Sequence, residues 1–126
     1  MALTATETFN QNPGSRGSGV LVVRINNDAA GGSTTIALNG TSPSANTSTS
    51  ETVIDMSIAE IVWGNDQLTT ITRNGIEVFR AAAGSGHMDF AHSQLRLEEE
   101  ALLNQDIVVN TNTGNATVLL KIHKRS

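Results

Sequence analysis

The chain has 126 residues and no cysteine, which allows one domain with a single core and excludes disulfides and thiolate metal sites. Its formal net charge is −4, with 8 Lys and Arg against 12 Asp and Glu, so it lacks the surplus of cations that a nucleic-acid-coating protein needs. No apolar run approaches the roughly 20 residues that span a bilayer, so we expect no membrane partner.

Residues 1–19 are polar and contain Pro13 and three glycines. This pattern predicts an extended N-terminal arm that becomes ordered only when something else holds it. Asn12, Pro13 and Arg16, the only cation of the arm, are its candidate partner-binding residues. The first residues lack the basic and apolar regions of a secretory signal, so we expect synthesis in a host cytoplasm.

Residues 20–126 are predicted to form one β domain, because Thr, Asn, Ser and Gly make up 49 of the 126 residues and favour short strands joined by turns. Residues 20–25 are an apolar run of strand length, with residues 34–38 as the expected partner and residues 27–33 as the loop between them. Residues 40–50 are expected to form a long projection or a segment packed on a neighbour.

Residues 53–63 alternate between apolar and polar side chains, but the phase slips after Ile58. The same stretch also fits a helix, with Ile54, Ile58 and Ile61 on one face. We favour a strand with a β-bulge near Ala59 and Glu60, because Val, Ile and Trp suit a half-buried pleated surface. Two strands meeting at a corner would explain the slip as well.

Asn74-Gly75 lies between the β-rich runs 68–73 and 76–80 and predicts a type I′ hairpin. In this register Arg73 lies opposite Ile76, and Ile71 lies opposite Val78. The small residues 81–86 then leave the sheet, and residues 87–90 form a short strand or a corner.

Residues 95–103 fit either a short helix or a strand that ends at an acidic rim. Residues 106–110 and 116–123 are predicted to form a closing hairpin, in which Val118, Leu120 and Ile122 share one face. The whole pattern predicts an all-β antiparallel sandwich or jelly-roll-like barrel with seven to nine short strands.

His87, Asp89 and His92 are the best candidates for chemistry, because two imidazoles and a carboxylate fall within six residues. On a strand, His87 and Asp89 point the same way and could bind Zn²⁺ or Mn²⁺ if a turn brought His92 to them. The simpler interpretation is a capping aspartate beside partly exposed histidines, so we expect no metal, no cofactor and no enzymatic activity. Trp63 is the only candidate platform for a sugar, and its apolar neighbours favour core packing instead.

Four segments within residues 53–124 resemble small virion structural proteins of tailed bacteriophages: the tryptophan run 61–64, the hairpin 71–78, the glycine-rich corner 84–90 and the closing strand 116–124. Met88 departs from the pattern, which has a second aromatic residue there. The resemblance implies a β-sandwich that binds the outside of the capsid as a decoration protein. Its expected partners are the major capsid protein and further copies of itself, with a homotrimer as one possibility, and its expected location is the virion surface.

Two alternatives stay open. The chain could be another virion component, such as a tail tube, fibre or minor coat protein, or it could be a carbohydrate-binding β-sandwich. In the decoration protein, residues 1–19 are expected to reach neighbouring capsomers and to become ordered on assembly.

Overall fold

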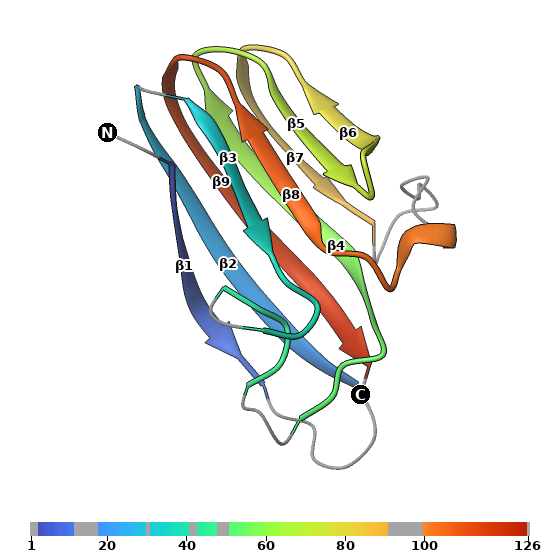
Figure 1. The fold of residues 1–126 in the computed structure, drawn as a ribbon. Helices are drawn as coiled ribbons and strands as arrows, with labels where there is room; N and C mark the ends of the chain where they lie inside the picture. The colour runs from blue at the N-terminus through green and yellow to red at the C-terminus, as the bar shows by residue number, and fades with distance from the viewer. Residues whose placement is uncertain are drawn as a thin grey trace.

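The computed structural model describes residues 3–11, 18–29, 31–40, 43–47, 51–90 and 100–125. These residues form two antiparallel β-sheets packed face to face, with a single turn of 3-10 helix, η1 (Glu100–Leu102) (Figure 1). The strands are β1 (Leu3–Asn10), β2 (Ser18–Ala29), β3 (Gly32–Ile36), β4 (Asp55–Asn65), β5 (Thr69–Arg73), β6 (Ile76–Ala81), β7 (Gly84–Asp89), β8 (Ile107–Thr111) and β9 (Gly114–Arg125).

The strand order identifies the fold as a jelly roll. The five-stranded sheet has the order β1-β2-β9-β4-β7, and the four-stranded sheet has the order β3-β8-β5-β6. Strands pair in a nested way, β2 with β9, β3 with β8, β4 with β7 and β5 with β6, as in a long hairpin folded over on itself. The predicted all-β antiparallel sandwich is confirmed, and β1 is an additional edge strand beside β2.

The core lies between the two sheets and is almost entirely aliphatic. The predicted face of β9 is confirmed, because Val118, Leu120 and Ile122 are all buried. Trp63 of β4 packs edge-on against Phe79 of β6, with ring centroids 5.3 Å apart, and so joins the two sheets as the core-packing interpretation predicted. The other buried members of the sheets include Leu21, Val23, Ile25, Met56, Ile58, Ile61, Ile36, Ile71, Ile107 and Val109.

Two local predictions from the alternation of side chains are confirmed. Residues 55–65 form strand β4, and its register against β9 shifts between Ile58 and Glu60, as expected for a bulge at this point. The β5–β6 hairpin turns at Asn74 and Gly75, which both have positive φ angles of 51° and 78°.

The predicted register of this hairpin is only partly right. Arg73 lies opposite Ile76 as expected, but Ile71 lies opposite Phe79 and not opposite Val78. An irregularity between Ile71 and Thr72 leaves one extra residue on β6, which shifts the pairing beyond it by one position.

Two predicted strand pairings are wrong because the chain crosses between the sheets. Residues 27–29 continue β2, and β3 pairs with β8 in the opposite sheet, so it does not pair with residues 20–25. Similarly, β8 and β9 belong to different sheets and do not form a closing hairpin. Both crossings use glycines with positive φ angles, Gly31 at 80° and Gly114 at 128°, which allow sharp changes of chain direction.

The predicted N-terminal arm is wrong over residues 3–10. These residues form β1, which pairs antiparallel with β2 along its length (Figure 1). Leu3, Ala5 and Glu7 face inward and are partly buried. This segment is therefore a half-buried edge strand, although its composition is polar. Asn12, Pro13 and Arg16 lie outside the described residues.

Candidate functional site

The outward side of the five-stranded sheet forms one continuous surface, which we call the five-stranded face. It is built from the side chains that alternate with the buried core residues of each strand. Strand register places them in rows that cross the sheet. One row contains Thr6, Arg24, Leu119, Val62 and His87, and the next contains Phe9, Val22, Lys121, Glu60 and Asp89.

Apolar side chains lie exposed in the middle and at one edge of the five-stranded face. Phe9 is 54% exposed and Val62 is 37% exposed, and Val22 and Leu119 are half-buried. Val22 lies directly opposite Phe9, and Leu119 lies directly opposite Val62. Such side chains gain free energy when a partner covers them, because apolar surface leaves water.

Charges on the five-stranded face are separated by sign. Arg24 of β2 and Lys121 of β9 lie on one side, and Glu60 of β4 and Asp89 of β7 lie on the other. This arrangement can orient a protein partner, because an incorrectly rotated partner would meet like charges.

Two of the three candidate metal ligands, His87 and Asp89, lie on this face. His87 and Asp89 point the same way on β7, as predicted, and Glu60 lies between them and the centre of the sheet. His87 Nε2 is 3.6 Å from Glu60 Oε2, and His92 lies outside the described residues. Within the described residues, no group of three or more His, Cys, Asp or Glu side chains is arranged to hold a metal ion.

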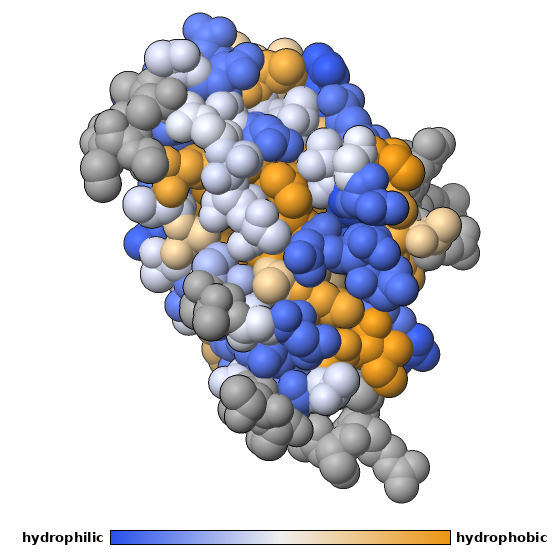
Figure 2. All heavy atoms as spheres, in the orientation of Figure 1, coloured by the Kyte–Doolittle hydropathy of each residue, from blue (hydrophilic) through white to orange (hydrophobic). Residues whose placement is uncertain are grey.

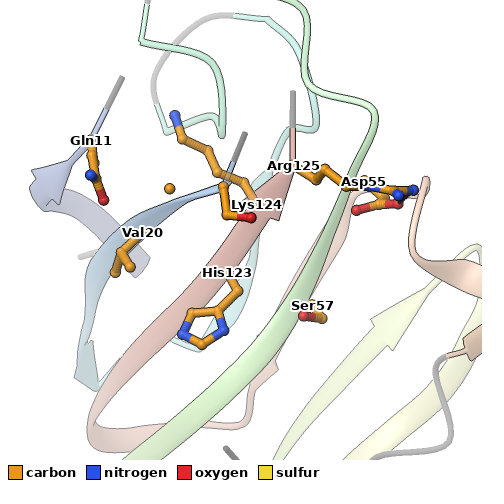
Figure 3. A pocket seen from close by; sticks show the side chains of 9 residues that line it. Gln11, Val20, Asp55, Ser57, His123, Lys124 and Arg125 are labelled. Carbon is orange, nitrogen blue, oxygen red and sulfur yellow. Dashed lines mark hydrogen bonds and ion pairs between the residues drawn. The ribbon is translucent and has the colours of Figure 1, made fainter. Parts of the chain in front are cut away.

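An open pocket of about 360 Å³ lies at one end of the same sheet (Figure 3). His123 of β9 and Ser57 of β4 lie opposite each other in its wall. Arg125 donates a hydrogen bond to the Asp55 carboxylate across 2.5 Å. Ser57, His123 and Asp55 all line this pocket, but the Asp55 carboxylate is bound by Arg125. The pocket therefore offers hydrogen-bonding groups and not an assembled Ser-His-Asp triad.

His123 was not among the candidate residues from the sequence, because it lies far along the chain from His87, Asp89 and His92. The pairing of β9 with β4 brings it to Ser57, and no local motif could have indicated that contact. The same applies to Lys124, whose side chain points away from His123 and Ser57 into the interior (Figure 3).

The outward side of the four-stranded sheet, which we call the four-stranded face, is different. It consists mainly of small polar side chains, and Figure 2 shows mostly hydrophilic and intermediate colours over β3, β8 and β5. Arg80 donates hydrogen bonds to the Glu77 carboxylate at 3.0 and 3.1 Å, and these bonds raise the pKa of Arg80 above its ordinary value. The small polar side chains of the four-stranded face include Ser33, Thr35, Thr70, Thr72 and Asn110.

No protein-family model and no curated protein matches the sequence. The described part of the chain also contains no helix that is long and apolar enough to cross a membrane.

Proposed function

We propose that the protein is a structural component of a tailed-phage virion, which decorates and stabilises the outside of the capsid. In this proposal the five-stranded face binds the major capsid protein. The observation that carries the proposal is the exposure of Phe9 and Val62 on this face, next to charges separated by sign. This combination is suited to a flat contact with another folded protein.

The filled interior supports a role in protein contacts. Jelly rolls occur in viral capsid proteins, lectins and cupins, so the fold alone does not decide between these functions. Here the space between the sheets is occupied by packed aliphatic side chains such as Leu21, Ile61 and Leu120, each fully buried. The pocket lies outside this core, at the end of the five-stranded sheet.

A capsid would bind many copies of the protein, so the contact made by each copy can be weak. Many symmetry-related copies convert weak single contacts into strong collective attachment, so each copy needs only a few exposed apolar residues. The resemblance of residues 53–124 to phage virion proteins points to the same location. Further copies of the chain are proposed as additional neighbours on the shell.

Co-sedimentation with capsids tests the proposal. Heads of the encoding virus, prepared without this protein, are mixed with wild-type protein, with Val62→Glu or with Thr70→Glu. Val62→Glu places a charge in the centre of the five-stranded face, whereas Thr70→Glu places the same charge on the four-stranded face.

We expect wild type and Thr70→Glu to co-sediment with heads, and Val62→Glu to bind about tenfold more weakly or worse, because an unpaired charge would be buried in the contact. Circular dichroism is the control that checks whether both variants are folded. Equal binding by the two variants would contradict the assignment of the face, and absence of wild-type binding would contradict capsid decoration.

A carbohydrate-binding role is the second candidate, favoured by several polar side chains in the pocket wall. Gln11, Asp55, His123 and Arg125 could donate to and accept from sugar hydroxyls. No ring of Trp or Phe belongs to the lining, and Trp63 packs against Phe79 instead of offering a stacking platform. Thermal stabilisation of the isolated protein by a sugar, lost in His123→Ala, would favour this candidate over capsid decoration.

A further inference from the structure

A lysine, an asparagine and a glutamate meet inside the protein, at the end of the sandwich where β1 and β9 finish. Lys124 Nζ donates hydrogen bonds to Asn10 Oδ1 at 2.8 Å and to Glu51 Oε1 at 3.1 Å, and a third to the carbonyl oxygen of Ala45. The Lys124 side chain is 0% exposed, and the Glu51 side chain is 1% exposed. The amine is therefore held in a dry site, against an amide carbonyl and a carboxylate.

The orientation of the Asn10 amide follows from its neighbours. Its nitrogen Nδ2 donates to Glu7 Oε1 at 3.0 Å and to the carbonyl oxygen of Ser44 at 3.3 Å, while its oxygen accepts from Lys124. An ammonium can only donate and a carboxylate can only accept, so the amide oxygen must face Lys124. The amide carbon thus has the amine on one side and its own nitrogen held by Glu7 on the other.

We propose that Lys124 and Asn10 form an intramolecular isopeptide bond, with Glu51 as the proton-transfer group. Glu51 accepts a proton from the Lys124 ammonium, and the resulting amine attacks Cγ of Asn10. The Nζ–Cγ bond forms and the Cγ–Nδ2 bond breaks. A second proton passes from Nζ to Nδ2, which leaves as ammonia, so a primary amide and an amine become a secondary amide and ammonia with no oxidant or reductant.

The structure supplies what this reaction needs. Fixing the amine beside the amide makes the attack intramolecular, which greatly raises the effective concentration of the nucleophile. Exclusion of water from the Lys124 and Glu51 side chains strengthens the influence of Glu51 on the reacting charges. Glu51 is itself positioned by Thr47, whose backbone N–H and hydroxyl donate to Oε1 at 2.7 and 2.8 Å.

The bond would join the first strand of the jelly roll to the last. Asn10 ends β1, an edge strand of the five-stranded sheet, and Lys124 lies near the end of β9, the central strand. A covalent link at this point would prevent β1 from separating from the sheet. This inference stands independently of the proposed capsid partner, because it concerns the isolated chain.

Mass spectrometry of the purified wild-type protein tests the proposal directly. We expect the intact protein to be lighter than its sequence by one ammonia. Succinimide formation at Asn39-Gly40 or Asn74-Gly75 would cause the same loss, so the position must be mapped by trypsin digestion. The expected product is a branched peptide that contains residues 1–16 and 122–125, because acylation of Lys124 blocks cleavage after it.

Three variants complete the experiment. Asn10→Ala removes the electrophile but keeps Lys124 beside Glu51, and Glu51→Gln removes the proton acceptor; both should give only linear peptides. Asn26→Ala, an asparagine on the outward side of β2, should retain the branched peptide. Linear peptides alone from folded wild-type protein would overturn the proposal and leave Lys124 as a hydrogen-bonded buried ion pair. A branched peptide that persists in Glu51→Gln would overturn the role of Glu51.

Discussion

Gly86 leaves room for the Trp63 side chain, which packs against Phe79 of the other sheet. Trp63 and Gly86 lie directly opposite each other on β4 and β7, and the indole occupies the space above the glycine. A Cβ atom on residue 86 would contact three atoms of the ring, with Cε2 and Cη2 at only 2.9 Å. Glycine is therefore required at residue 86 by the close approach of the indole ring. Backbone conformation is not the reason, since the φ angle of Gly86 is not positive.

Gly86→Ala should therefore lower the free energy of unfolding by about 1–3 kcal/mol, because the added methyl overpacks the site and displaces Trp63 from Phe79. Urea denaturation followed by tryptophan fluorescence measures this change. Gly64→Ala is the matched control, since nothing lies within 4 Å of its added Cβ atom. The control should change stability by less than about 1 kcal/mol, in the stabilising direction. Equal stability of the two variants would contradict the packing argument.

At the scale of elements, alternation of side chains predicted which residues form strands and which side of a strand is buried. The bulge near Ala59, the turn at Asn74-Gly75 and the buried side of β9 all follow from local patterns, because each depends on neighbours in the sequence. Strand β1 did not stand out, because its threonines alternate with Leu3, Ala5 and Glu7, and its largest apolar residue, Phe9, lies on the outward side.

Strand partners could not be predicted in the same way. Alternation indicates the buried face of a strand but does not identify its neighbour, and the pairing of β2 with β9 joins opposite ends of the chain. Short connections at Gly31 and Gly114 resemble hairpin turns in sequence, although both carry the chain from one sheet to the other.

Arg73 connects three elements in a way that the hairpin pattern did not indicate. Its side chain is fully buried and donates to the carbonyl oxygens of Met56 in β4 and of Leu103 and Gln105 after η1, at 2.9, 3.1 and 2.7 Å. The guanidinium therefore holds the segment before β8 against the end of the β5–β6 hairpin.

Arg73→Met should destabilise the protein by about 3 kcal/mol or more, because three carbonyl groups lose their donor and an unpaired buried acceptor costs roughly 1–3 kcal/mol. Arg73→Lys, which keeps the charge but cannot reach all three carbonyls, should fall between wild type and Arg73→Met. Chemical denaturation measures the order of the three proteins. An Arg73→Met protein as stable as wild type would show that these hydrogen bonds do not hold the segment.

At the scale of the whole molecule, the sequence predicted only part of the candidate site. His87 and Asp89 do share one side of a strand, because that follows from a spacing of two residues. The exposed apolar centre of the five-stranded face combines Val22, Val62 and Leu119 from three strands, so it depends on pairings that local patterns do not determine. The cluster of Asn10, Glu51 and Lys124 was missed for the same reason.

The two outward faces of the jelly roll differ in chemistry, and this difference leads to one prediction about orientation on a capsid. The five-stranded face carries exposed Phe9 and Val62, whereas the four-stranded face carries mainly hydroxyl and amide groups. Burial of apolar area favours the first as the contact surface, because hydroxyl and amide groups lose hydrogen bonds to water when they are covered.

Electron cryomicroscopy of whole virus particles tests the proposed capsid contact. We expect density for the jelly roll on the outside of the head, with β2, β9 and β4 facing the capsid protein and β3, β8 and β5 facing solvent. Density that places the four-stranded face against the shell would contradict the assigned contact surface, and particles that hold the chain only in the tail or lack it would contradict the proposed function.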